Sequence, residues 1–295
     1  MHERPGVRDF MILLGLSLVW GSSYILIKWG LEIYTPQQVA VLRLGISALA
    51  LSPLAVRHLR RVHWRQLPLL IAVGLTGTAL PSFLFPVAQT HLSSSLTGML
   101  SGLTPLCTFL VAWLIFSSRP VVRQVIGIGL GLLGAAVLAY VAPGAEGQQT
   151  TQFAYAGLIL VACCCYGLSS NLVANYFREL PSLTITVVSF FLVGLPAVGW
   201  ALTYGGVVPT TIAGGAAGGK ALVYVAILAL GSTVLASVLF FRLVQRTGAV
   251  FASTVSYLIP VVALGWGLAD GEGFSAWQLP AVALVLTGIF LSKRK

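Results

Sequence analysis

Charged residues are scarce in this chain. They make up 8% of its 295 residues, with 17 lysines and arginines against only seven aspartates and glutamates, whereas about 25% is usual in a soluble domain. Because 57% of the residues are apolar, there is too little polar surface to face water, which excludes an ordinary soluble domain. The net charge of +10 does not indicate a nucleic-acid partner, because the basic residues are dispersed between apolar runs.

Cysteine is rare, and the usual catalytic motifs are missing. The four cysteines, Cys107 and the run Cys163-Cys164-Cys165, lie within apolar stretches, and neighbouring cysteines on one helix point in different directions, so we expect no disulfide framework. No histidine or carboxylate lies at metal-ligand spacing from them, and the sequence has no HExxH, no GxSxG and no paired carboxylates. We therefore expect no metal site, no cofactor and no enzymatic activity.

Long apolar runs dominate what remains. A hydrocarbon core about 30 Å thick takes roughly 20 helical residues to cross, and a helix satisfies its own backbone hydrogen bonds in lipid. The sequence therefore predicts an all-α membrane protein with ten transmembrane helices. The ten stretches are residues 10–29, 36–56, 67–88, 94–116, 122–141, 153–177, 183–203, 220–241, 249–269 and 276–292.

The basic residues predict how the chain is oriented. With the N-terminus in the cytoplasm, 14 lysines and arginines fall on the cytoplasmic side, Lys28 and Lys220 fall on the outer side, and Arg43 lies inside a span. Cytoplasmic loops carry such an excess of positive charge. An even number of spans then puts both termini in the cytoplasm. Of the longest connections, 143–152 and 204–219, the second is rich in glycine and predicts a flexible loop.

Short motifs recur in the two halves at nearly constant offsets of 146, 155 and 154 residues. Five spans in each half is an odd number, so the second copy enters the membrane upside down, as in the inverted repeats of secondary transporters. We predict two inverted five-helix repeats, residues 1–142 and 153–295, around a central cavity. The matched motifs are Trp20-Gly21 with Tyr166-Gly167, Leu103-Thr104-Pro105 with Leu258-Ile259-Pro260, and Gln124 and Gly134 with Gln278 and Gly288.

Four features occur together in this sequence. They are Trp20-Gly21 in the first span, Pro105 in a fourth span rich in small residues, a glycine-rich fifth span, and the five-plus-five duplication. In these the chain resembles the drug/metabolite transporter superfamily, and within it the EamA-type ten-helix exporters, some of which are bacterial amino-acid exporters. The resemblance covers the whole chain. It implies a central cavity, alternating access, and export of a small metabolite across the bacterial cytoplasmic (inner) membrane.

One departure from that family concerns the end of the fourth span. Many members carry a glutamate there, next to an arginine, whereas this chain has Ser117-Ser118-Arg119-Pro120. The second half keeps an acid at the corresponding place, Glu272. An ion-pair latch through the first glutamate is therefore not expected here.

A solute path needs polar groups that face inward at membrane depth, where they are costly against lipid. Polar and aromatic residues recur at helical spacing on the first, third, fourth, sixth, eighth and ninth spans, which we predict to wall the cavity. The alternative for each residue is ordinary packing or hydrogen bonding between helices. The candidate solute-binding residues are Trp20, Tyr24, Ser82, Phe85, Gln89, Ser101, Tyr166, Ser170, Asn171, Ser237, Phe240, Ser256 and Tyr257.

Four further residues are candidates for gating, coupling or hinge motion. Arg43 lies about 10 Å inside its span. There it reaches outward to the headgroups, pairs with helix C-terminal carbonyls, or takes part in gating or in holding an anionic group. His91 is a candidate for proton coupling, or is simply exposed at the end of its span. Pro105 and Pro260 occupy matching places in the two halves as hinges or as static kinks.

The acids indicate how transport is driven. None is predicted at the membrane midplane, which disfavours antiport through a buried carboxylate and favours facilitated export. The predicted solute pocket has no obvious fixed charge, which favours a neutral or zwitterionic solute over a polyanion. We expect a secondary transporter that exports small neutral metabolites, amino acids before others, with the solute and the lipid bilayer as its partners. A multidrug or other metabolite exporter of the same fold is the nearest alternative, and a membrane enzyme or a non-transporting scaffold are more distant ones.

Overall fold

The computed structural model describes residues 6–117, 121–143, 149–203 and 205–292, and the regular structure within these ranges is helical throughout. The helices of the first half are α1 (Val7–Gly21), α2 (Ser23–Leu31), α3 (Pro36–Leu59), η1 (Trp64–Gln66), α4 (Leu67–Gly74), η2 (Leu75–Ala79), α5 (Leu80–Gln89), α6 (Ser94–Ser101), α7 (Thr104–Phe116) and α8 (Val122–Tyr140). Those of the second half are α9 (Gln149–Tyr176), α10 (Ser182–Thr203), α11 (Val207–Ala213), α12 (Gly215–Ile227), η3 (Leu228–Leu235), α13 (Ala236–Thr247), α14 (Ala249–Ala252), η4 (Ser253–Tyr257), α15 (Ile259–Ala269) and α16 (Gln278–Ser292).

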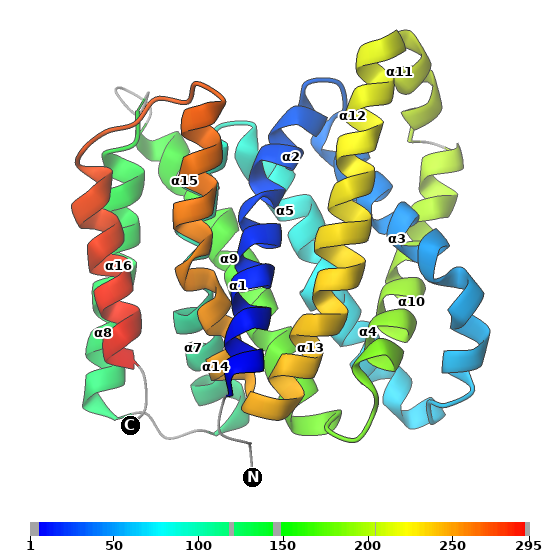
Figure 1. Ribbon diagram of the computed structural model, residues 1–295, viewed down its shortest axis with the longest axis horizontal. Helices are drawn as coiled ribbons and strands as arrows, with labels where there is room; N and C mark the ends of the chain where they lie inside the picture. Colours follow the sequence, from blue (N-terminus) through cyan, green and yellow to red (C-terminus); the bar gives the residue numbers. More distant parts are fainter. Residues whose placement is uncertain (1–5, 118–120, 144–148, 204, 293–295) are drawn as a thin grey trace.

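These helices account for the predicted spans. Within the described ranges, eight helical segments are long and apolar enough to cross a bilayer, and α6 with α7, which meet at a 40° bend, make a ninth. The apolar helix α16 is shorter and corresponds to the tenth predicted stretch. The chain enters the bundle through α1 and leaves it through α16 at the same end (Figure 1), which an even number of crossings requires. The predicted all-α membrane fold is confirmed.

The two halves pack against each other in symmetric pairs. Helix α3 packs along α10, and α8 packs along α16, so the second and fifth spans each contact their own counterparts. The contact of α7 with α9 is matched by the contact of α15 with α1. Exchanging the halves therefore leaves these contacts unchanged. With five spans in each half, this is the packing of an inverted repeat.

Two glycines show the same symmetry in atomic detail. A Cβ atom on Gly21 would lie 2.5 Å from the Cβ of Val262, and one on Gly167 would lie 2.8 Å from the Cα of Thr108. The two glycines belong to the matched motifs of the sequence, and Thr108 and Val262 are themselves 154 residues apart. In each half the glycine lets the helix that begins the repeat approach the fourth span of the other half closely.

Five spans are interrupted near their middle, close to where the halves meet. The first breaks at Ser22, and the fourth breaks at Gly102 and Leu103. The third and eighth spans each contain a π-helical segment, η2 and η3, and the ninth contains the 3₁₀ segment η4. Such segments free backbone carbonyls from the regular helical pattern and are frequent at functional sites.

The glycine-rich connection contains the helix α11 and the start of α12, so the prediction of a flexible loop over 204–219 is wrong in its described part. Tyr204 lies outside the described residues, as do residues 144–148 of the other long connection and residues 118–120 after the fourth span. Left-handed backbone at Gly206 (φ 59°) and Gly215 (φ 54°) lets α11 begin and turn into α12. Polar side chains from the first half hold this segment in place. The Tyr34 hydroxyl lies 2.6 Å from the Thr211 hydroxyl, and Gln38 Nε2 donates to the Gly205 carbonyl at 2.9 Å.

Candidate functional site: a cavity between the two repeats

A cavity lies between the two halves at the level of the interrupted helices. It is lined by the first four spans of the first half and by the sixth, eighth and ninth spans of the second. Its volume is about 70 Å³, below the roughly 300–1,000 Å³ of pockets that hold small molecules, so the cavity is narrow in this arrangement.

Ten of the residues singled out from the sequence line this cavity. They come from seven spans, and they combine aromatic rings, hydroxyl groups and one guanidinium. Their role in solute binding stays a prediction, but the structure brings them together around one space. They are Trp20, Tyr24, Arg43, Phe85, Ser101, Tyr166, Ser170, Ser237, Phe240 and Ser256.

Four candidate binding residues do not line it. Asn171 Nδ2 donates to the carbonyls of Thr108 and Gly167 at 2.9 and 2.8 Å, so it joins α9 to α7 as an interhelical hydrogen bond. Ser82 is fully buried, and Tyr257 packs against the hydrophobic core beside the cavity. Gln89 lines a separate pocket near Lys28 and Glu272.

The gating, coupling and hinge candidates are spread over the fold. His91 lies at the exposed end of its span, outside the cavity, with its ring stacked on Tyr155 at 3.9 Å between centroids. Pro105 and Pro260 stand in the first turn of α7 and α15, directly after the interruptions of the fourth and ninth spans. At that position the missing N–H of proline costs no helical hydrogen bond. A hinge role for these prolines stays a prediction.

Aromatic rings form the wall of the cavity. The rings of Trp20 and Phe240 lie 5.0 Å apart in an edge-to-face arrangement. Phe85 lies between two tyrosines, 5.6 Å from Tyr24 and 6.0 Å from Tyr166. The wall therefore offers both apolar faces and phenolic hydroxyls to whatever enters.

The π-helical segments place further polar groups on the same wall. Gly77 and Thr78 come from η2, and Ser232 and Thr233 come from η3. The Trp20 indole N–H donates to the Ser232 carbonyl at 2.8 Å, which fixes the orientation of the ring. The η3 segment thus supplies a carbonyl that a regular helix would use within itself.

Arg43 lies at the edge of this wall, with only 7% of its surface exposed. Its Nε donates to the Thr233 hydroxyl at 2.7 Å. The side chain therefore turns toward the eighth span and the cavity, and the alternative that it reaches outward to lipid headgroups is wrong.

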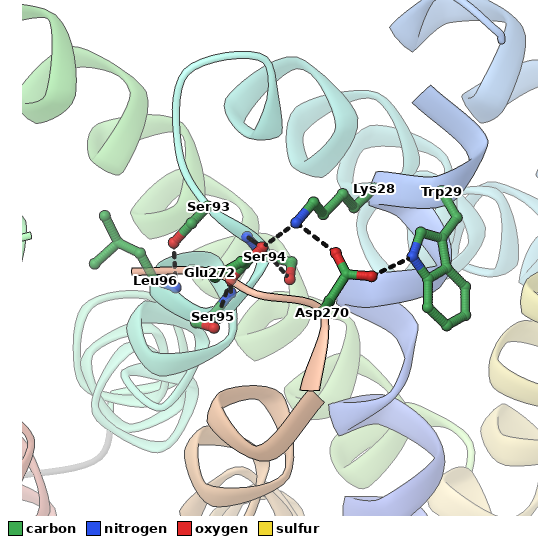
Figure 2. Close-up of polar contacts among 8 residues, drawn as sticks. All are labelled: Lys28, Trp29, Ser93, Ser94, Ser95, Leu96, Asp270 and Glu272. Atoms are coloured by element: carbon green, nitrogen blue, oxygen red, sulfur yellow. Dashed lines mark hydrogen bonds and ion pairs between the residues drawn. The ribbon is translucent and has the colours of Figure 1, made fainter. Parts of the chain in front are cut away.

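Ion pairs join the two repeats at one end of the cavity, the end to which the sequence assigns the outer side. Lys28 Nζ lies 2.6 Å from Asp270 and 3.0 Å from Glu272 (Figure 2). Asp270 also accepts a hydrogen bond from the indole N–H of Trp29 at 2.8 Å. The acid that the second half keeps after its fourth span thus belongs to an ion pair with the first half.

Glu272 also caps the first turn of α6. It accepts hydrogen bonds from the backbone N–H groups of Ser94 and Ser95 at 3.0 and 2.9 Å, and from both serine hydroxyls (Figure 2). A carboxylate at a helix N-terminus is favoured by the helix dipole and by the unpaired N–H groups there. Burial disfavours the ionised form, but the bonds from Ser95, Lys28 and Ser94 outweigh it and hold the pKa of Glu272 at about 2.

Comparison with known proteins places this arrangement in a family. The chain matches the EamA-like transporter family twice, over residues 9–140 and again over residues 154–294. The chain belongs to the EamA-like transporter family. Its two matches fall on the two halves that the packing relates by symmetry, and membership makes it a multi-pass membrane transporter.

Several relatives of this EamA-family chain carry transporter names. A protein of Archaeoglobus fulgidus named an uncharacterized transporter is 22% identical over 96% of this chain and 98% of its own length. A probable terminal-alkyne amino-acid exporter of Streptantibioticus cattleyicolor is 27% identical over 51% of this chain and 50% of its own length. A solved crystal structure matches 97% of this chain, and 96% of its own, with a TM-score of 0.65 at 17% identity, which shows the shared fold.

Some cavity residues of this EamA-family protein were not expected from the sequence. Thr78, Ser169, Ser232 and Thr233 line the space, but none was singled out. The repeat offset was a usable signal, because Thr78 and Thr233 are 155 residues apart, as are the singled-out pair Phe85 and Phe240. Within the described ranges, no group of three or more histidine, cysteine or acidic side chains is placed to hold a metal ion.

Proposed function

We propose that this EamA-family protein exports small neutral metabolites, amino acids before others, from the cytoplasm of a bacterium by alternating access. The observation that carries the proposal is the cavity, whose lining comes from both repeats and combines aromatic rings with hydroxyl groups. Such a lining suits a small solute with an apolar part and a few hydrogen-bonding groups. The name of the Streptantibioticus relative, a probable amino-acid exporter, points the same way.

Alternating access requires the two repeats to separate at one end of the cavity while they stay together at the other. Polar and charged groups tie the repeats at both described ends. At the Lys28 end, two carboxylates meet one ammonium group, and one of them also caps α6. At the end near the termini, Arg246 Nη2 lies 3.7 Å from the buried Asp9, and His58 Nδ1 lies 2.8 Å from the Thr184 hydroxyl. We assign the Lys28 end to the outside because of the excess of basic residues on the other side, so the ion pairs of Lys28 hold the cavity closed to the outside.

Facilitated export down a concentration gradient is the driving mode we propose. No acidic side chain of the described residues lines the cavity, so a proton relay through a buried carboxylate has no candidate there. His91 lies outside the cavity, on the exposed surface, and nothing in its surroundings favours coupling. Pro105 and Pro260, beside the interruptions of the fourth and ninth spans, are the proposed hinges of the closing motion.

Flux of radiolabelled solutes in proteoliposomes tests this function. Purified protein is reconstituted, vesicles are loaded with one of a panel of labelled amino acids, and efflux is followed against protein-free vesicles. We expect protein-dependent efflux of at least one amino acid with an apolar side chain. No efflux of any amino acid, together with efflux of a labelled lipophilic cation, would instead identify a multidrug exporter.

A further inference from the structure

The guanidinium of Arg43 is held at the cavity by a fixed hydrogen bond. The Thr233 hydroxyl that accepts from Arg43 Nε at 2.7 Å itself donates to the Leu228 carbonyl at 3.2 Å. Because its proton is used in this way, the hydroxyl oxygen presents a lone pair to the arginine. The π-helical segment η3 therefore fixes the position of the Arg43 guanidinium between α3 and the cavity wall.

No acidic partner balances this charge within the described part of the chain. Asp9 pairs with Arg246, and Asp270 and Glu272 both pair with Lys28. The neighbours of Arg43 on the cavity side are the neutral phenols of Tyr24 and Tyr166, which interact with it electrostatically. A buried arginine at membrane depth without an anion is costly, and such residues mark binding sites by default.

We propose that Arg43 binds the carboxylate of the transported solute. The inference rests on the proposed function and narrows it to solutes that carry a carboxylate on an apolar or aromatic body. A guanidinium presents donors in a planar fork that matches a carboxylate with two parallel hydrogen bonds. Binding would supply the anion that the described residues lack around Arg43.

The rest of the solute would lie along the aromatic wall. Trp20, Phe85 and Phe240 offer apolar ring faces, and the amino group of a zwitterion would find phenol oxygens and ring faces there. A cationic amine without a carboxylate would instead meet Arg43 as a like charge. Selectivity against lipophilic cations therefore comes from the same residue that selects for carboxylates.

A binding measurement with matched aromatic probes separates recognition of the carboxylate from recognition of the aromatic ring. Thermal unfolding of the purified protein is followed with phenylalanine, phenylacetate, phenylacetamide and phenethylamine. We expect stabilisation by the two carboxylates and none by the amide or the amine. Arg43→Gln should weaken the apparent affinity for phenylacetate about tenfold or more, the usual effect of losing a charge-assisted hydrogen bond.

Three variants show whether the effect belongs to the guanidinium at this position. Arg43→Lys keeps the charge but not the fork and should restore part of the carboxylate response. Thr233→Val removes the hydroxyl that positions Arg43 and should weaken phenylacetate binding. Arg65→Gln, which removes an exposed guanidinium far from the cavity, should behave like the wild type. Unfolding without ligand checks that each variant is folded.

The binding and flux measurements together test the role of Arg43 separately from the proposed export function. Equal responses of the wild type to phenylacetate and phenylacetamide, no response to any probe, or an undiminished phenylacetate response in Arg43→Gln would overturn the assignment of Arg43. Carboxylate binding that depends on Arg43 but is accompanied by no flux in proteoliposomes would support the assignment and contradict export. Phenylalanine efflux with an unchanged KM in Arg43→Gln would support export and remove Arg43 from the site.

Discussion

Glu272 holds Ser95 twice, through the backbone N–H at 2.9 Å and through the hydroxyl at 2.5 Å. Both bonds end on the same carboxylate oxygen, and the other oxygen contacts Ser94 and Lys28. Glu272 belongs to the connection between α15 and α16, whereas Ser95 lies in the first turn of α6 in the other repeat. One carboxylate therefore joins the two repeats at the end of the cavity that we assign to the outside.

Replacing this carboxylate by an amide should destabilise the fold. Glu272→Gln is expected to lower the free energy of unfolding by about 1.5–3 kcal/mol, because the buried donors of α6 lose a charged acceptor. Thermal unfolding of the purified variant measures the change. Glu32→Gln removes an exposed acid of the first half and should change the stability by less than about 0.5 kcal/mol. Equal stability of both variants would contradict the role of Glu272.

The stabilisation by Glu272 should persist as the pH falls to the ordinary pKa of its carboxyl, 4.5. Its folded-state pKa is lowered from 4.5 to about 2, and the pKa of Asp270 is lowered as well, first of all by the hydrogen bond from Lys28. A carboxylate with a depressed pKa stabilises the fold fully above its unfolded pKa, and this contribution is lost as the pH falls through the folded value. The difference in melting temperature between wild type and Glu272→Gln should stay constant from pH 8 to pH 6 and shrink only below the ordinary pKa. A difference that vanishes already between pH 7 and pH 6 would contradict this.

Lys28 is the cation that both carboxylates share, so its removal should favour the state open to the outside. Lys28→Met leaves two acids facing each other without a counter-charge. A cysteine placed at Ser101 in the cavity, in a chain without the four native cysteines, should then react faster with a membrane-impermeant maleimide added to whole cells. Lys220→Met, which lies at the start of the eighth span away from the ion pair, serves as the control. An unchanged labelling rate would show that the ion pair does not close the cavity.

Close packing of α8 on α16 gives a test of the symmetric core. A Cβ on Gly288 would lie 2.5 Å from the Gly127 carbonyl oxygen and 2.6 Å from the Gly131 nitrogen, and neither backbone atom can move cheaply. Gly288→Ala should therefore destabilise the protein by about 1–3 kcal/mol. A Cβ on Gly129 of the same helix pair meets nothing within 4 Å, so Gly129→Ala should be neutral or stabilise by up to about 1 kcal/mol. Denaturant or thermal unfolding in detergent compares the two, and equal effects would contradict the packing.

Much of the fold could be predicted because lipid leaves few choices. Apolar runs long enough to cross a bilayer must be helical, and the repeated motifs at Gly21 and Gly167 correctly indicated which helices correspond. The prediction failed over residues 205–219, where glycines normally mark loops. Two glycines there adopt left-handed backbone and frame α11, and Tyr34 and Gln38 of the first half hold the segment. Such partners, remote in the sequence, leave no local pattern.

The cavity wall was partly predictable for a similar reason. Aromatic and hydroxyl residues at helical spacing gave Trp20, Tyr166 and Ser256, which the structure places on the wall. Asn171 has the same character but bonds to α7 instead, because the direction of a polar side chain depends on which helix packs beside it. The π-helical segments that carry Thr78 and Thr233 have no simple sequence signal, and the ion pair of Lys28 with Glu272 joins residues 244 positions apart.

A comparison of transport by the variants Trp20→Ala and Trp64→Ala tests the central claim that the solute passes through the cavity between the repeats. Trp20 lines the cavity and bonds to η3, whereas Trp64 is 68% exposed in η1, outside it. The measurement is efflux of labelled phenylalanine from proteoliposomes that contain equal amounts of folded protein. We expect Trp20→Ala to reduce the efflux rate at low solute concentration about tenfold or more, as for a buried aromatic contact residue, and Trp64→Ala to match the wild type. Wild-type efflux from Trp20→Ala would contradict the account.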